Sequence, residues 1–202
     1  MKTRTIPILI ALAGAAYFGS SGCLSGRGFE LGPYPIAVDL GDGVIRDQLV
    51  GLPIGIETTI EEEQDLCPVL VNVDVDQLVR DQVGDAVANR VTVSGLLLRE
   101  LVLTATQGDF EDLHHGKLFF VPASEDGEPQ LIGEVDSEDG FGLEITVSIQ
   151  GDFDLLPIIE EVQANPGGPC PSVRLELRGL WPDDKIEYMS TGMVDVFLIA
   201  GL

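Results

Sequence analysis

The chain has 202 residues, 45% of them apolar, and its 34 acidic residues against 11 lysines and arginines give a formal net charge of −23. This length and apolar content are enough for the core of one domain. Such acidity argues against nucleic-acid binding, because it repels phosphate backbones, and against flat adsorption on anionic lipid. High solubility or a salty habitat explains the acidity, and cation binding is the alternative.

Residues 1–22 have the organisation of a secretory signal peptide. Lys2 and Arg4 precede an apolar run, Ile6–Phe18, which is followed by glycines and serines. The run is shorter than the roughly 20 residues that a membrane-spanning helix needs. We therefore expect the chain to be exported and this segment to be removed.

Cys23 is the predicted site of lipid attachment. It follows Ser21 and Gly22 in a segment that resembles a bacterial lipobox, where signal peptidase II cuts before a cysteine that becomes lipid-modified. Ser20 stands where lipoboxes usually have leucine, so cleavage by the ordinary signal peptidase is the alternative. Several acyl chains on one residue would anchor the protein stably. By similarity to bacterial sorting rules, Leu24 favours the outer membrane.

The next segment links this anchor to the domain. Residues 23–34 have no apolar periodicity and include Ser25, Gly26, Gly28, Gly32 and Pro33, which predicts a flexible tether. The folded domain is expected to span residues 35–202. Its first two strands are predicted at Pro35–Leu40 and Pro53–Ile60, with a turn at residues 39–43 between them.

Acidic residues gather at two places early in the domain. Asp39, Asp42 and Asp47 surround two glycines, as in a calcium loop, but the EF-hand order of ligands is absent. Glu61–Asp65 is predicted to be an acidic loop. Solvated side chains explain both segments, so we assign no metal ligand, and calcium binding is kept as an alternative.

Two cysteines remain once Cys23 carries lipid. Cys67 and Cys170 each precede a proline, and an even pair in an exported chain predicts a disulfide. That bond would close a loop of about 100 residues and stabilise the domain by about 4 to 5 kcal/mol in the chain-entropy model. A reactive thiol or a metal site is the alternative, although no histidine or third cysteine keeps metal-ligand spacing with the pair.

Between these cysteines the apolar pattern changes period. Alternating valines predict a half-buried strand over Pro68–Val75, and spacing of three and four residues then predicts one short helix over Asp76–Asn89, capped by Asp76 and weakened by Gly84. Asp152–Val162 is expected to be a connecting loop, with one helical turn as the alternative. The other segments alternate at period two between acidic, glycine-containing turns, which indicates an antiparallel β-sandwich. The remaining predicted strands are Val91–Thr106, bent or bulged at Gly95 and Arg99–Glu100, then Lys117–Val121, Gln130–Val135, Gly142–Ile149, Ser172–Leu177 and Lys185–Ile199.

The alternation also predicts which side chains share the core. Alternate residues of a strand point to opposite faces, so one set should point inward and the set between them outward. The expected outward residues are Glu144, Thr146, Arg174 and Glu176. The expected core residues are Val69, Val71, Val73, Leu143, Ile145, Val147, Ile149, Val173, Leu175 and Leu177.

The stretch from Val91 to Ala200 resembles a group of small Gram-negative envelope lipoproteins of unknown function. The shared pattern consists of apolar segments and turns at Leu101–Thr104, Phe110, Leu113, Leu118–Val121, Asp154–Pro157 and Pro182–Asp184. The resemblance implies an all-β fold, an antiparallel immunoglobulin-like β-sandwich, here with one short helix. It implies no catalytic residues.

Few residues suggest chemistry. The sequence after the signal has no nucleophile elbow, phosphate loop or HExxH motif. His114 and His115 follow acidic residues that offer mixed metal ligands, but adjacent histidines seldom converge on one ion, so a solvated loop is favoured. Trp181 is expected to pack in the core rather than stack on a ligand. We assign no catalytic residue and no cofactor.

These observations predict a non-enzymatic lipoprotein of the cell envelope, anchored in the outer membrane through Cys23. Its expected role is structural or protein-interacting, with another envelope protein as the partner. A calcium- or small-ligand-binding β-sandwich is the alternative.

Overall fold

The computed structural model describes residues 29–45, 56–124, 127–180, 182 and 185–200. Several predictions fall on residues outside these ranges and stay predictions: the signal peptide, lipidation of Cys23, the tether over residues 24–28, the third calcium-loop residue Asp47, the start of the strand predicted at Pro53–Ile60, and the packing of Trp181. None of the helices within the described ranges has the length and apolar character that a membrane span requires.

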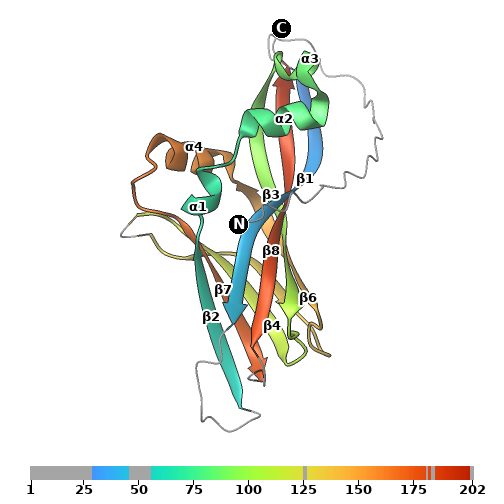
Figure 1. The fold of residues 1–202 in the computed structure, drawn as a ribbon, viewed down its shortest axis with the longest axis vertical. Helices are drawn as coiled ribbons and strands as arrows, with labels where there is room; N and C mark the ends of the chain where they lie inside the picture. Colours follow the sequence, from blue (N-terminus) through green and yellow to red (C-terminus); the bar gives the residue numbers. More distant parts are fainter. Residues whose placement is uncertain (1–28, 46–55, 125–126, 181, 183–184, 201–202) are drawn as a thin grey trace, which may run out of the picture.

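Within the described residues, eight antiparallel strands form one curled sheet in the order β1-β8-β3-β6-β5-β4-β7-β2 (Figure 1). The curl folds β1-β8-β3-β6 over β5-β4-β7-β2, and a single residue pair, Gly133 with Ile149, joins the two halves. The predicted all-β antiparallel sandwich is confirmed. The strands are β1 (Phe29–Ile45), β2 (Glu57–Asp65), β3 (Val91–Gln107), β4 (Leu113–Val121), β5 (Gln130–Asp136), β6 (Glu144–Asp154), β7 (Ser172–Leu180) and β8 (Ile186–Ala200).

The connectivity is that of a jelly roll. The first strand pairs with the last, β2 with β7, β3 with β6 and β4 with β5, so the chain resembles one long hairpin folded over itself. The resemblance implied an immunoglobulin-like order, whereas the observed order has this nested pairing. Alternation along a strand determines its faces and not its neighbours, which is why the sequence pattern could not distinguish the two.

The strand boundaries differ from prediction near the N-terminus. Residues 29–34, assigned to the tether, pair with β8 as the start of β1. The expected turn at residues 39–43 is wrong, because β1 runs through it to Ile45. From Val91 onward the predicted strands are confirmed. The register of β3 shifts at Val93/Gly95 and at Leu98/Glu100, where bulges were expected.

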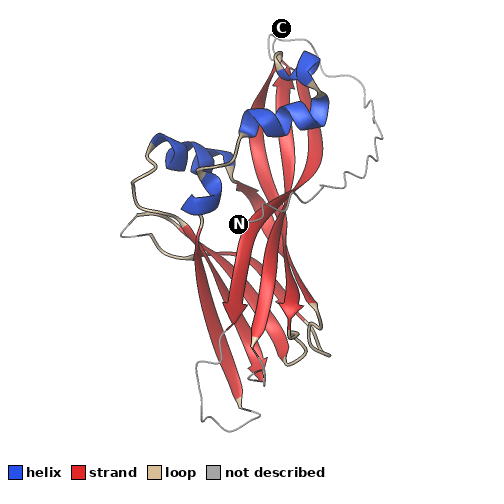
Figure 2. Ribbon diagram, viewed as in Figure 1, coloured by secondary structure: helices blue, strands red, loops and turns tan. Residues whose placement is uncertain are grey.

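The helices lie together at one end of the sandwich (Figure 2). The prediction of one short helix is wrong, because the described residues contain α1 (Cys67–Leu70), α2 (Val75–Val83), α3 (Asp85–Ala88) and α4 (Leu156–Ala164). Gly84, with φ of 78°, separates α2 from α3, and the N-cap of α2 is Asp74, whose carboxylate accepts from Gln77 N at 2.8 Å. The expected cap, Asp76, instead lies in the first turn.

Two segments predicted as strand and loop are helical. Pro68 occupies the first turn of α1, where a missing N–H costs nothing, and Leu66 and Leu70 are both buried at helical spacing. The strand predicted from the alternating valines is therefore wrong. Pro157 likewise occupies the first turn of α4, a helix of nine residues, which is longer than the single helical turn considered for the expected connecting loop.

Cys67 and Cys170 are joined, so the predicted disulfide is confirmed. The bond links the start of α1 to the segment before β7 across a sequence separation of 103 residues. Leu66 N donates a 3.0 Å hydrogen bond to Pro171 O beside it, so covalent and backbone links coincide there.

The buried residues form two clusters, and the prediction of one shared core is wrong. One cluster, around Phe110 and Leu113, lies between the two halves of the sheet. The other, around Val79 and Ile159, lies beneath the helices. The reason is strand length: β1 and β3 have 17 residues and β8 has 15, whereas β2, β4 and β7 have nine, so the longer strands extend past the opposite sheet and the helices cover them.

The predicted inward residues divide accordingly. Ile145, Val147, Leu175 and Leu177 are buried, and Ile149, Val173, Val69 and Val73 are partly buried against the clusters. Val71 and Leu143 are 38% and 64% exposed, so their assignment is wrong. Val71 follows a helix instead of lying in a strand, and Leu143 belongs to the turn before β6. Glu144 and Thr146 are exposed as predicted, and Arg174 and Glu176 are half-buried.

Candidate functional site

The sandwich has an open side between β1 and β2. These strands stand at opposite ends of the strand order and share no ladder within the described residues. We call this side the seam, defined by residues 39–44 of β1 and 62–64 of β2. The side chain of Gln64 crosses it, where Nε2 donates a 2.7 Å hydrogen bond to Leu40 O. Edge strands with unpaired backbone groups are places where other molecules attach.

A bulge in β1 shapes the seam. The register with β8 shifts between Asp39 and Gly41. Gly41 has φ of 103°, a backbone conformation that residues other than glycine rarely adopt. The Asp39 carboxylate accepts from Gly41 N at 2.8 Å, and the buried Ser190 hydroxyl donates to Gly41 O at 2.7 Å. Asp39 and Asp42 thus belong to a strand.

On the other side of the seam, β2 replaces the acidic loop that was predicted at Glu61–Asp65. Burial alternates along the strand: Ile60 is buried, and Glu62 and Gln64 lie on its face, while Glu61 is exposed on the other. One carboxylate of this acidic strand therefore points to the inside of the sandwich.

A hollow of about 450 Å³ extends inward from the seam. Its volume is in the range of small-molecule sites in proteins. Side chains from both halves of the sheet form its floor, and the edge strands form its rim. The floor consists of Leu101, Leu103, Leu118, Val173 and Leu175, and the rim and walls consist of Leu40, Asp42, Gly43, Val44, Glu62, Glu63, Gln64, Tyr188 and Ser190. We call this hollow the seam pocket.

Tyr188 forms one wall and is only 6% exposed. It lies opposite Gly43 in the β1–β8 ladder, and a Cβ on Gly43 would come within 2.1 Å of Tyr188 Cζ, so the glycine leaves room for the ring. Burial, and then the negative charge of Glu62, raise the pKa of Tyr188 to about 12. The hydroxyl therefore stays protonated at neutral pH.

A larger hollow of about 890 Å³ lies between α2, α4 and the start of β3. Two of its polar side chains are already engaged with helix backbone groups. Asp74 caps α2, and Gln163 Nε2 donates to Leu70 O at 3.2 Å and to Val73 O at 2.7 Å. We favour the seam pocket because it reaches the core of the sandwich.

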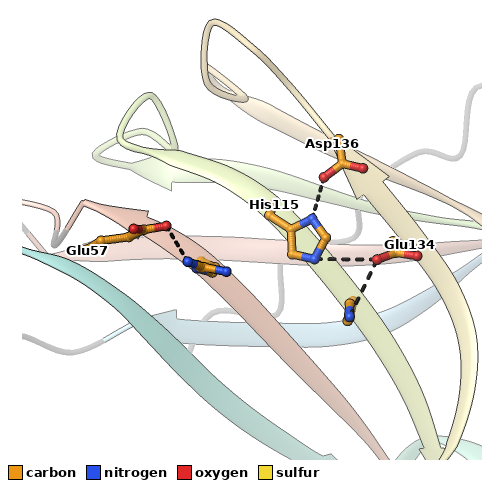
Figure 3. A network of polar contacts seen from close by, with 6 residues as sticks. Glu57, His115, Glu134 and Asp136 are labelled. Atoms are coloured by element: carbon orange, nitrogen blue, oxygen red, sulfur yellow. Dashed lines mark hydrogen bonds and ion pairs between the residues drawn. The ribbon is translucent and has the colours of Figure 1, made fainter.

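The adjacent histidines do not lie in the solvated loop that the sequence suggested. His115 is on β4, between Asp136 and Glu134 of β5 (Figure 3), with Nε2 3.4 Å from a Glu134 oxygen. Lys117 Nζ lies 3.5 Å from the same carboxylate. No group of three potential metal ligands occurs in the part of the chain that the structure describes. The network is a cluster of polar side chains on the outer face of the sheet.

The lining of the seam pocket offers apolar and polar contacts to a bound molecule. Its lining combines an apolar floor with carboxylates, an amide and hydroxyls, and among the described residues it includes no histidine or cysteine. The Ser190 hydroxyl is engaged with Gly41 O. The sequence prediction missed Glu62, Tyr188 and Gln64. Thr58, Ile60, Glu62 and Gln64 do alternate, but the inward face was too polar for that pattern to be recognised.

No protein-family model and no curated protein matches the sequence. Among solved structures, the decameric BFDV capsid protein has a TM-score of 0.37 and 10% identity, covering 82% of this chain and 98% of that one. The 60-mer BFDV capsid protein has a TM-score of 0.36 and 10% identity, covering 88% and 96%. A structure of infectious bursal disease virus, Gx strain, has a TM-score of 0.28 and 13% identity, covering 88% and 33%. Similarities at this level carry no conclusion about function.

Proposed function

We propose that this chain is an exported, non-enzymatic binding module of the cell envelope that holds a small ligand in the seam pocket. The observation that carries the proposal is the pocket itself: a hollow of about 450 Å³ with an apolar floor and a polar rim at the open side of a sandwich. Such hollows, with a few polar groups placed around apolar walls, are the usual form of small-molecule sites.

Three features support placement in the envelope. The N-terminal segment has the pattern of a secretory signal, and the lipobox-like sequence ends at Cys23. The Cys67–Cys170 disulfide suits an oxidising compartment outside the cytoplasm. The resemblance to Gram-negative lipoproteins suggests the outer membrane as the anchoring surface.

The fold also suggests how an anchored molecule would be oriented. Phe29 pairs with Ala200 at the helical end of the sandwich. It is only six residues after Cys23, and six residues of fully extended chain are at most about 20 Å long. The seam begins ten residues farther along β1, at Asp39, which corresponds to roughly 33 Å of strand. A lipid on Cys23 would therefore place the helical end near the membrane and the seam pocket toward the aqueous space.

Methyl NMR with a simple apolar probe tests the pocket. On addition of 1-octanol, we expect shifts of the methyl signals of Leu101, Leu103 and Leu118 on the pocket floor. Leu66 and Leu70, buried in the other cluster, serve as internal controls and should not move. Absence of shifts on the floor would count against a ligand pocket. If calcium alone raised the melting midpoint, the calcium-binding alternative would be favoured instead.

A further inference from the structure

Uncharged polar side chains line the seam pocket at Gln64, Ser190 and Tyr188. The first two are engaged with the backbone of β1. Gln64 Nε2 donates to Leu40 O at 2.7 Å, and the Ser190 hydroxyl donates to Gly41 O at 2.7 Å. These two hydrogen bonds serve the fold of the seam.

The hydroxyl of Tyr188 differs from these two groups. Within the described ranges it takes part in no hydrogen bond, although the residue is only 6% exposed. Burial and the charge of Glu62, and no hydrogen bond, raise the pKa of Tyr188 to about 12. Buried tyrosine hydroxyls usually have a hydrogen-bond partner, and a polar group that lacks one destabilises the protein. A bound molecule could supply that partner.

The position of the ring directs this hydroxyl to the hollow. Phe110 packs against the ring, with centroids 6.2 Å apart. A Cβ on Gly43 would lie 2.3 Å from Tyr188 Oη, and both residues line the seam pocket. Unlike Arg174 Nε, which is fully enclosed without a partner, Tyr188 Oη keeps contact with open space. That space is the seam pocket, because the residue lines it.

A hydroxyl at the edge of a core has an ordinary explanation, which is that it meets water. This explanation accounts for the oxygen of Tyr188 but not for a hollow that reaches the buried Leu101 and Leu103 beside it. The phenol is protonated at neutral pH and can donate a hydrogen bond, so the matching group of a ligand is an acceptor.

The lining disfavours charged head groups. The described lining residues include no lysine, arginine or histidine that could pair with an anion, and the formal charge of the whole chain is −23. A quaternary ammonium group has no lone pair and cannot accept a hydrogen bond from a phenol.

We infer that the seam pocket takes an uncharged amphiphile, with its aliphatic chain on the leucine floor and an oxygen that accepts a hydrogen bond from the Tyr188 hydroxyl. This inference rests on the proposed function and defines its ligand class.

Two probes of the same shape test the hydrogen bond. 2-Hexanone has a carbonyl oxygen where 2-methyl-1-hexene has a methylene group. Titrations of the full-length exported chain follow the methyl signals of Leu101, Leu103 and Leu118, which give an apparent dissociation constant for each probe. Hexanoate and hexyltrimethylammonium, which are charged and of similar length, should bind more weakly than 2-hexanone.

The matched variants are Tyr188→Phe and Tyr34→Phe, each of which removes one hydroxyl; Tyr34 packs against the other cluster. Tyr188→Phe should weaken binding of 2-hexanone about fivefold, the factor that one hydrogen bond contributes, and leave 2-methyl-1-hexene unchanged. Tyr34→Phe should change neither. In the wild type, the carbon-13 signal of Tyr188 Cζ should shift with 2-hexanone and not with 2-methyl-1-hexene, a measurement that needs no variant.

The outcomes are distinguishable. If none of the probes shifts the floor methyls, the proposed function fails together with the inference. If the probes shift them but Tyr188→Phe weakens both uncharged probes alike or neither, or if Tyr188 Cζ responds to neither, the pocket stands and the hydrogen bond is overturned. If a charged probe binds more tightly than 2-hexanone, the uncharged ligand class is overturned.

Discussion

Replacing Tyr188 with Phe should change how the stability of the protein depends on pH. Burial and the charge of Glu62 raise the pKa of Tyr188 from 10.0 to about 12. Below pH 10 the phenol is protonated in both the folded and the unfolded state, so its contribution to stability is fully present. Between these two pKa values the unfolded phenol ionises first, and the free energy of unfolding falls as the pH rises.

The magnitude follows from the size of the shift. Two pKa units correspond to about 3 kcal/mol over the whole interval, and roughly 1.3 kcal/mol of this is lost between pH 9 and pH 11. Urea unfolding followed by far-ultraviolet circular dichroism at these two pH values measures it. The difference in the free energy of unfolding between wild type and Tyr188→Phe should fall by that amount from pH 9 to pH 11. Glu62→Gln should make the free energy of unfolding fall less steeply with pH, because it removes the second cause of the raised pKa of Tyr188. Parallel pH dependences for wild type and Tyr188→Phe would refute the reasoning.

Three further predictions concern the glycine under this ring, the disulfide and the anchor. Gly43→Ala should lower the free energy of unfolding by about 2 kcal/mol in urea titrations, because the added Cβ would overlap Tyr188. The control Gly167→Ala, whose Cβ would have no atom within 4 Å, should change it by less than about 0.5 kcal/mol. Equal effects of the two variants would contradict the packing of Gly43 against Tyr188. Reducing Cys67–Cys170, which closes a separation of 103 residues, should lower the melting temperature by roughly 10 to 20 °C without changing the far-ultraviolet spectrum in the cold. Cys23→Ala should move the protein from the membrane to the soluble fraction, and membrane retention of this variant would argue against a lipid anchor.

The strands from β3 onward could be predicted because one face of each is buried and the other is solvated. Ile145 and Val147 alternate with Glu144 and Thr146, and this order follows directly from burial against a core. The same rule failed at α1, where valines alternate by chance and the buried positions are Leu66 and Leu70. Local alternation could not distinguish that segment from a strand, because the contacts that decide it come from other parts of the chain.

The candidate site could not be predicted for a related reason. Glu62 and Gln64 interrupt the apolar face of β2. The sequence of this strand, whose inner face lines a pocket, is therefore indistinguishable from that of an acidic loop. Tyr188 lay in a predicted strand, but its importance depends on Gly43, which is far away in sequence and opposite it in the ladder. Nested strand pairing brings these residues together, and alternation along the chain contains no information on such pairing.

The two ends of β2 are held in different ways. At one end, the Asp65–Ser172 pair is followed at once by the disulfide between Cys67 and Cys170. At the other end, Glu57 pairs with Leu180, and its carboxylate meets Arg178 at 2.8 Å in an exposed ion pair of the kind that contributes little in water. Local opening of β2 should therefore begin at Glu57 and stop at the disulfide, which holds the other end of the strand in place. Residues 62–64, which border the seam, lie next to the fixed end, so that side of the seam pocket should keep its shape while the other end of β2 frays, and backbone amides near Glu57 should exchange with solvent faster than those near Asp65.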